Sequence, residues 1–153
     1  MCKPLVVFSL AVALIGCSGE FPRDPDRTSA RMRGGVIQVG ISHDAPHVVV
    51  PMSGAPSGSD VARILALARR HGARVHWVRG DHDGLMRDLQ ARRLQAVIGG
   101  VHADSPWGPH VGLSREFDAV DAEGRTIRRV IAMPPGENAW LMSLDTLLLE
   151  ADR

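Results

Sequence analysis

The stretch VIQVGI at residues 36–41 decides the fold of this chain. It is short, apolar and rich in β-branched residues, which predicts a buried β-strand. A loop rich in Pro, Gly and Ser follows over residues 42–58, and after it apolar residues recur at helical spacing. These residues are Val61, Ile64, Leu65 and Ala68. A strand followed by an amphipathic helix indicates an α/β fold.

The alternation of strand and helix continues downstream. Gly72 ends the first helix, and a second strand is predicted over residues 75–78. Asp81 or Asp83 begins a second helix, and a third apolar run covers residues 96–101. Such alternation predicts a parallel sheet with helical crossovers, and strands this apolar are covered on both faces.

The C-terminal part is less regular. We expect an extended piece over residues 111–117, a polar turn over 118–125, a strand over 126–133 and a helix from Asn138. The apolar stripe of that helix consists of Trp140, Leu141, Leu144, Leu147 and Leu148. The whole pattern predicts a single three-layer α/β lobe over residues 36–153, with a mostly parallel sheet that the last strand joins and the last helix covers.

The N-terminus has the features of a secretory signal. Lys3 precedes an apolar run over residues 4–15, which is shorter than the ~20 apolar residues of a transmembrane helix. The run ends in LIGC at residues 14–17, which resembles the lipobox of bacterial lipoproteins. The resemblance implies that residues 1–16 are a signal peptide cleaved after Gly16, and that Cys17 carries the lipid anchor.

Residues 17–35 have no apolar periodicity, so we expect the lipidated Cys17 to be followed by a flexible tether. This places the protein in the cell envelope, lipid-anchored to a membrane and facing the periplasm. Ser18 follows the Cys, and by resemblance to lipoprotein sorting rules this favours the outer membrane.

Composition excludes several classes of function. The 18 basic and 17 acidic residues nearly balance, so we expect no nucleic-acid partner. Cys2 leaves with the signal and Cys17 is lipidated, which leaves no thiol for catalysis, a disulfide or metal binding. No nucleophile elbow, phosphate loop or dinucleotide motif is present, and we expect neither an enzyme nor a cofactor.

Several segments, taken in order, resemble the family 3 extracellular solute-binding proteins, which are periplasmic receptors of amino-acid-type ABC importers. The segments are residues 35–41, 57–61, 71–75, 89–100 and 111–114, and residues 130–141 resemble the C-terminal return of that family. The resemblance implies a periplasmic-binding-protein type II fold, in which two lobes clamp a solute. Between Phe117 and Thr126 this chain has only eight residues, whereas a second lobe needs about 100. We therefore expect the first lobe alone.

The chain also departs from the family at Trp107. In amino-acid-binding members, an Arg at the matching position pairs with the ligand carboxylate, a task that suits a guanidinium. An indole has only an apolar face and one N–H donor. A standard α-amino acid would therefore lack a partner for its carboxylate at this position.

Polar residues follow the strands and should gather at one edge of a parallel sheet, where ligands bind. The candidate ligand-binding residues are His43, Asp44, His47, Ser57, Gly58, Asp60, His102, Asp104 and Trp107. Imidazoles and carboxylates suit a metal ion or a polar solute, but loops also carry them because loops are exposed. No metal-site spacing is present, so no metal is predicted. The helix start near Ser57 could attract an anion, although capping by Ser59 or Asp60 is the simpler reading.

Two functions fit these observations. The first is a membrane-anchored solute-binding-protein-like lipoprotein linked to ABC-type transport or ligand sensing, whose open cleft binds a small polar solute weakly. An envelope or transporter protein would be its partner. The alternative is a tethered protein-interaction module, or a reduced remnant, that has no small-molecule ligand.

Overall fold

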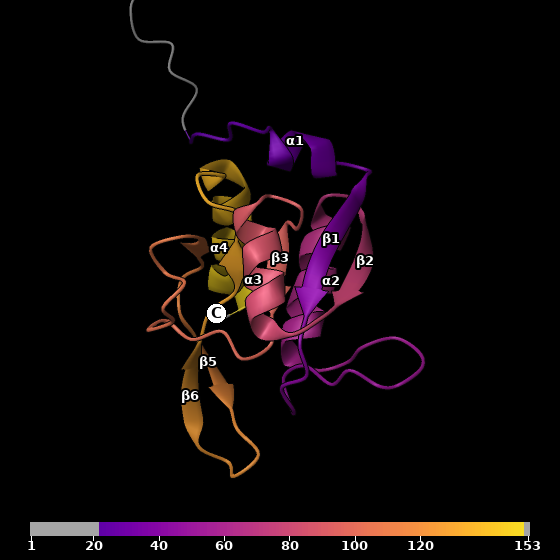
Figure 1. Ribbon diagram of the computed structural model, residues 1–153, viewed down its shortest axis with the longest axis vertical. Coiled ribbons are helices and arrows are strands. Elements are labelled where there is room, and N and C mark those ends of the chain that lie inside the picture. The colour runs from indigo at the N-terminus through magenta and orange to yellow at the C-terminus, as the bar shows by residue number, and fades with distance from the viewer. Residues whose placement is uncertain (1–21, 152–153) are drawn as a thin grey trace, which may run out of the picture.

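The five-stranded sheet at the centre of the lobe has the strand order β2-β1-β3-β7-β4 (Figure 1). The computed structural model describes residues 22–151. The strands are β1 (Val36–Ile41), β2 (Arg74–Arg79), β3 (Ala96–Ile98), β4 (Gly112–Leu113) and β7 (Ala132–Met133). β1 pairs in parallel with β2 and β3, whereas β7 runs antiparallel to both β3 and β4. The predicted mostly parallel sheet is therefore confirmed, and the last strand joins it.

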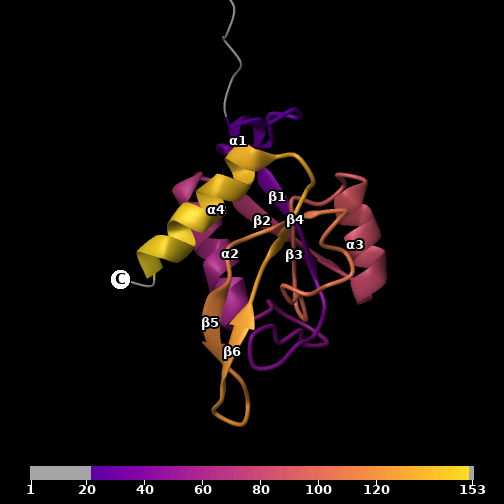
Figure 2. The same cartoon turned by 90° about the vertical axis from the view of Figure 1, so that its left-hand side faces the viewer.

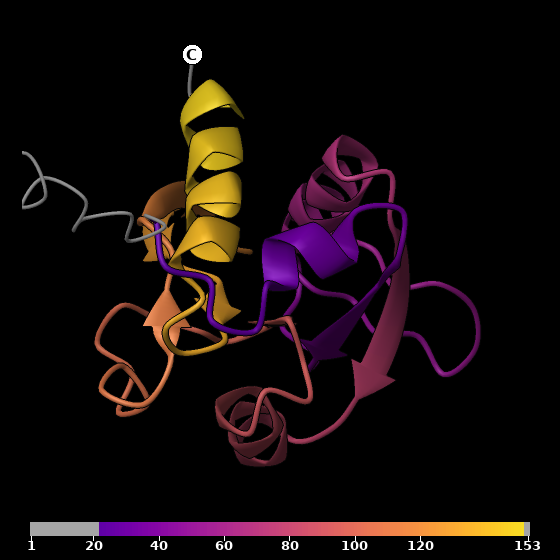
Figure 3. The same cartoon turned by 90° about the horizontal axis from the view of Figure 1, so that it is seen from above.

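Helices cover both faces of the sheet (Figures 2 and 3). On one face, α2 (Ser59–Arg70) and α4 (Asn138–Ala151) pack against the side chains of β1. On the other face lies α3 (His82–Gln90), which has an apolar cluster of its own with Val97 and Ala132. Trp140, Leu144 and Leu148 of α4 are buried, as the predicted stripe requires. The three-layer α/β lobe predicted from the sequence is confirmed.

Within residues 22–151, no helix combines the length and the apolar character needed to cross a bilayer.

The start of α2 differs from its prediction. Gly58, with a φ of 120°, occupies the position before the first turn, and no side chain caps the helix there. A Cβ on Gly58 would lie 2.2 Å from the backbone oxygen of His47, so this position requires glycine. The expected cap by Ser59 or Asp60 is therefore wrong, because the close approach of the chain at Gly58 turns both side chains to other partners. Asp81 caps α3 as predicted, since its carboxylate accepts the N–H of Gly84 at 2.8 Å.

The predicted strand over residues 126–133 is divided between two sheets. Its first half, β6 (Thr126–Arg129), pairs with β5 (Phe117–Val120) in a separate antiparallel ribbon, and its second half is β7. The ribbon projects from the lobe where the family resemblance would have a second lobe (Figure 1). The predicted turn over residues 118–125 is thus shorter than expected. It is closed by Asp121, whose carboxylate accepts the N–H groups of Glu123 and Arg125.

The expectation of a flexible tether over residues 17–35 is wrong from residue 22 onward, because the segment before β1 is folded against the lobe. Thr28–Met32 form a short helix, α1, that packs against α4, and Met32 is buried in the core. The buried Glu137 carboxylate accepts the N–H groups of Asp26 at 2.9 Å and Thr28 at 3.2 Å. These hydrogen bonds satisfy free N–H groups at the start of α1, and they bind the segment to the lobe. The signal peptide and Cys17 lie outside the described residues.

Asp24 and Glu137 form a coupled pair of carboxyl groups at this junction. Burial, together with the hydrogen bond and the charge of Glu137, raises the pKa of Asp24 to about 6. Burial opposes ionisation of Glu137 too, but hydrogen bonds from Asp24 and from the backbone of Asp26 outweigh it and lower the Glu137 pKa. The pair therefore retains one proton up to about pH 6, and that proton resides on Asp24.

The junction should consequently weaken as the pH rises. Because the pKa of Asp24 is higher in the folded protein, its contribution to stability is complete below about pH 4 and is lost as the pH passes 6. We expect Asp24→Asn to raise the melting temperature at pH 7.5 by a few degrees, about 1 kcal/mol after solvent screening, and to give no gain at pH 4. Thermal unfolding at both pH values measures this. Asp118→Asn, which removes an equal charge on the exposed ribbon, is the control, and equal gains at both pH values would contradict the prediction.

Candidate functional site

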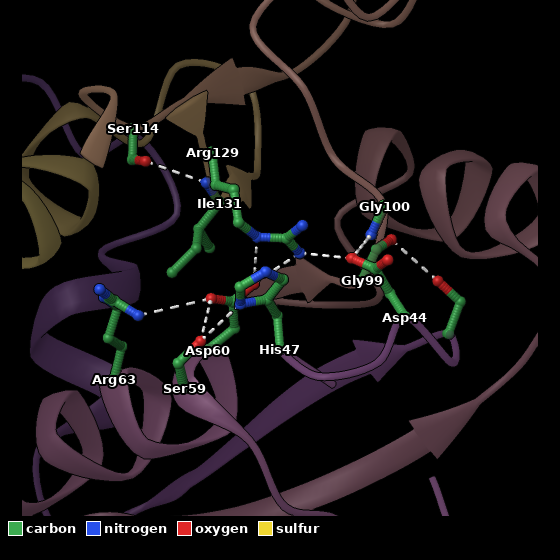
Figure 4. A network of polar contacts seen from close by, with 11 residues as sticks. Asp44, His47, Ser59, Asp60, Arg63, Gly99, Gly100, Ser114, Arg129 and Ile131 are labelled. Carbon is green, nitrogen blue, oxygen red and sulfur yellow. Dashed lines mark hydrogen bonds and ion pairs between the residues drawn. The ribbon is translucent and has the colours of Figure 1, made fainter. Parts of the chain in front are cut away.

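A buried arginine lies at the centre of the polar network below the strand ends (Figure 4). Arg129, the last residue of β6, is 2% exposed, and its Nε and Nη2 donate to Oδ2 of Asp60 at 3.1 and 2.8 Å. Asp60 is 1% exposed in the first turn of α2. Nη2 of Arg129 also donates to Oδ2 of Asp44, at 2.5 Å. One guanidinium thus joins the ribbon, α2 and the loop after β1.

Asp44 extends this network to the end of β3. Its Oδ2 accepts the N–H of Gly100 at 2.8 Å in addition to the guanidinium of Arg129. Burial opposes ionisation of Asp44, but the hydrogen bonds from Arg129 and Gly100 outweigh it and lower the pKa of Asp44. The carboxylate is therefore ionised and already neutralised by the protein, and it offers little to a ligand.

His47 is part of the same buried network. It is 4% exposed, and its Nδ1 lies 2.9 Å from the hydroxyl of Ser59. Burial, followed by the nearby charge of Arg129, lowers the pKa of His47, so the imidazole is neutral at pH 7. Three predicted ligand residues, Asp44, His47 and Asp60, are thus structural members of a brace around Arg129 and not an open binding face.

The loop over residues 42–58 accounts for three further candidates. His43 is exposed, and its Nδ1 accepts the N–H of Val50 at 3.2 Å. Ser57 pairs through its backbone with Val49. Gly58 provides the close approach to His47. The N–H of Asp60 donates to the His47 carbonyl and its carboxylate lies in the first turn, so the start of α2 does not suit an anion.

A hollow of about 290 Å³ opens beside this brace, where the start of α3 faces the loop after β3. Its lining residues are His82, Asp83, Gly100, His102, Asp104, Ser105, Pro106 and Trp107. The remaining predicted site residues, His102, Asp104 and Trp107, all belong to it. Gly100 connects the hollow with the brace, because it lines the hollow and donates to Asp44.

Trp107 forms one wall of the hollow. It is half-buried and packs against the apolar cluster of α3, because that cluster extends under the loop after β3. Its Nε1 donates to Oδ1 of Asp83 at 3.2 Å, and its ring meets His110 edge-on at 6.3 Å. The indole is therefore a fixed wall of the hollow.

Within residues 22–151, no group of three or more His, Cys, Asp or Glu side chains is arranged to hold a metal ion.

Sequence reasoning missed the two residues that organise these groups, Arg129 and Ser59. The signal for Arg129 was its position directly before the apolar run from Val130, where a charge that enters a buried strand needs a partner. For Ser59 no signal was available, because a helix start ordinarily turns its hydroxyl to the backbone.

No family model matches the chain, and no curated protein matches it significantly. Solved structures do match. The arginine-bound form of domain 1 from TmArgBP is 26% identical, with a TM-score of 0.67 over 79% of this chain and 97% of that one. The arginine-bound form of truncated ArgBP from T. maritima is 16% identical, with a TM-score of 0.68 over 80% of this chain and 99% of that one. The unliganded, open L-cystine solute receptor of Neisseria gonorrhoeae is 13% identical, with a TM-score of 0.65 over 80% and 90%.

The chain therefore has the fold of domain 1 of type II periplasmic binding proteins, and these structural neighbours are binding proteins and not enzymes.

The brace around Arg129 makes a sharp prediction for stability. Arg129→Ala removes both hydrogen bonds to Oδ2 of the buried Asp60 and leaves that carboxylate only Arg63, at 3.5 Å, and the Ser59 hydroxyl, at 3.3 Å, which should lower the free energy of unfolding by about 3 kcal/mol. The neighbouring Arg128 is exposed and pairs with Glu116 at 2.9 Å, so Arg128→Ala should cost at most about 1 kcal/mol. Urea unfolding of both variants provides the comparison. Equal losses would show that the buried pair does not support the fold.

Proposed function

We propose that this protein is a single-lobe relative of the family 3 solute-binding proteins, which binds a small polar solute for ABC-type transport or ligand sensing in the cell envelope. In this proposal residues 1–16 are a signal peptide, Cys17 carries the lipid and residues 36–153 form the binding lobe. The observation that carries it is the position of the hollow. It is lined by residues that follow β2 and β3, which both run parallel to β1, in a lobe with the fold of domain 1 of solute receptors.

A single lobe is compatible with solute binding. One structural neighbour is described as the arginine-bound form of domain 1 from TmArgBP, so in that protein one domain holds its solute. Here β5 and β6 pair with each other in an antiparallel ribbon. By the family resemblance, the chain would continue into a second lobe at this point. A solute in the hollow would keep one side in water, so we expect a dissociation constant above about 1 µM.

Solute binding should depend on residues that line the hollow and not on residues of the neighbouring loop. We expect a member of a panel of amino acids and amines to raise the melting temperature and to bind in calorimetry. His102→Ala, inside the hollow, should weaken that binding at least fivefold, whereas His43→Ala, an exposed histidine outside it, should not. Failure of every panel member to bind would favour the alternative, a tethered protein-interaction module.

The lipid anchor is tested separately. We expect the intact mass of the native protein to lack residues 1–16, and labelled palmitate to be incorporated, because the LIGC stretch resembles a lipobox. Cys17→Ser should abolish labelling and leave the signal uncleaved. Retention of residues 1–16 in the unsubstituted protein would contradict lipidation at Cys17.

A further inference from the structure

The hollow contains negative charge without a matching positive charge. Asp83 and Asp104 belong to its lining, and none of its described lining residues is Lys or Arg. Oδ1 of Asp83 accepts a hydrogen bond from the indole N–H of Trp107, which leaves the other carboxylate oxygen available to a ligand. The Asp104 side chain is exposed and makes no hydrogen bond or ion pair with the described residues.

Two arginines at the strand ends are already engaged. The guanidinium of Arg129 is paired with Asp44 and Asp60. Arg79, at the end of β2, donates to the carbonyl oxygens of Pro51 at 2.6 Å and Gly54 at 3.0 Å.

Two backbone donors at the rim are engaged as well. The Asp81 carboxylate occupies the start of α3, and Asp44 accepts the N–H of Gly100. A ligand carboxylate in the hollow would therefore meet two like charges and none of these donors.

Trp107 adds an attraction for positive charge. The face of an indole attracts ammonium and guanidinium groups by about 0.5–2 kcal/mol, more where water is excluded. The hydrogen bond to Asp83 and the contact with His110 fix the ring, so little conformational entropy is lost when a ligand binds.

We propose that the hollow takes a small organic cation, an amine or a guanidinium compound, and that it requires no carboxylate on its ligand. The inference rests on the proposed function, because it specifies the solute of the same site. The ammonium or guanidinium group is held by Asp104 and Asp83 against the indole of Trp107. A hollow of about 290 Å³ limits the ligand to a small molecule.

Agmatine and arginine provide a matched pair of probes, because both carry a guanidinium on a short chain and they differ in the carboxylate. Calorimetry at low salt on the mature chain should show agmatine binding at least threefold more tightly than arginine, and no binding of glutamate. Affinity for agmatine should fall at least fivefold in Asp104→Asn and stay unchanged in Asp118→Asn, which removes a similar exposed charge on the ribbon. Trp107→Phe should weaken binding less, because it keeps an aromatic face.

The outcomes separate the two proposals. Tighter binding of arginine than of agmatine, with loss of that binding in His102→Ala, would overturn the cation inference and leave the solute-binding function standing. Agmatine binding that is unaffected by Asp104→Asn would also overturn it, because the ligand would then lie elsewhere. Failure of all amines and amino acids to bind would overturn both.

Discussion

The pairing of Arg129 with Asp60 is the constraint on which the strand-end architecture depends. A guanidinium that is 2% exposed can remain charged only if carboxylates pair with it, and the buried Asp60 and the partly exposed Asp44 do so. Through Asp44 the constraint reaches Gly100, where the loop that lines the hollow begins. The buried ion pair thus fixes the position of the hollow, whose own side chains remain available to bind a ligand.

Local patterns predicted most of the fold, because the apolar spacing of a strand or helix is contained in a few neighbouring residues. VIQVGI forms β1, and the stripe of α4 is buried as expected. The division of residues 126–133 between two sheets was not predictable, since the apolar run is continuous and the partners of each half are distant in sequence. The docking of Thr28–Met32 on the lobe was not predictable for the same reason, because its contacts with Glu137 join residues more than 100 positions apart in the sequence.

The sequence named candidate residues by their type, but it did not reveal how they are organised. Residue type made Asp44, His47 and Asp60 look like ligands, yet Arg129, 85 residues from Asp44 and 69 from Asp60, forms hydrogen bonds with both carboxylates. His102, Asp104 and Trp107 do share a hollow, because parallel topology brings loop ends together whatever their sequence. What a side chain is free to do depends on its distant partners, and a sequence pattern does not contain them.

Docking of α1 also determines how the lobe would stand on a surface. The chain enters beside α1, and β1 runs from there toward the ribbon, so the strand ends lie on the opposite side of the lobe (Figure 1). With Cys17 lipidated as proposed, the five residue steps to Pro22 span at most about 18 Å. The anchored end of the lobe would then lie close to the bilayer, with the hollow and the ribbon on the side of the lobe away from the anchor.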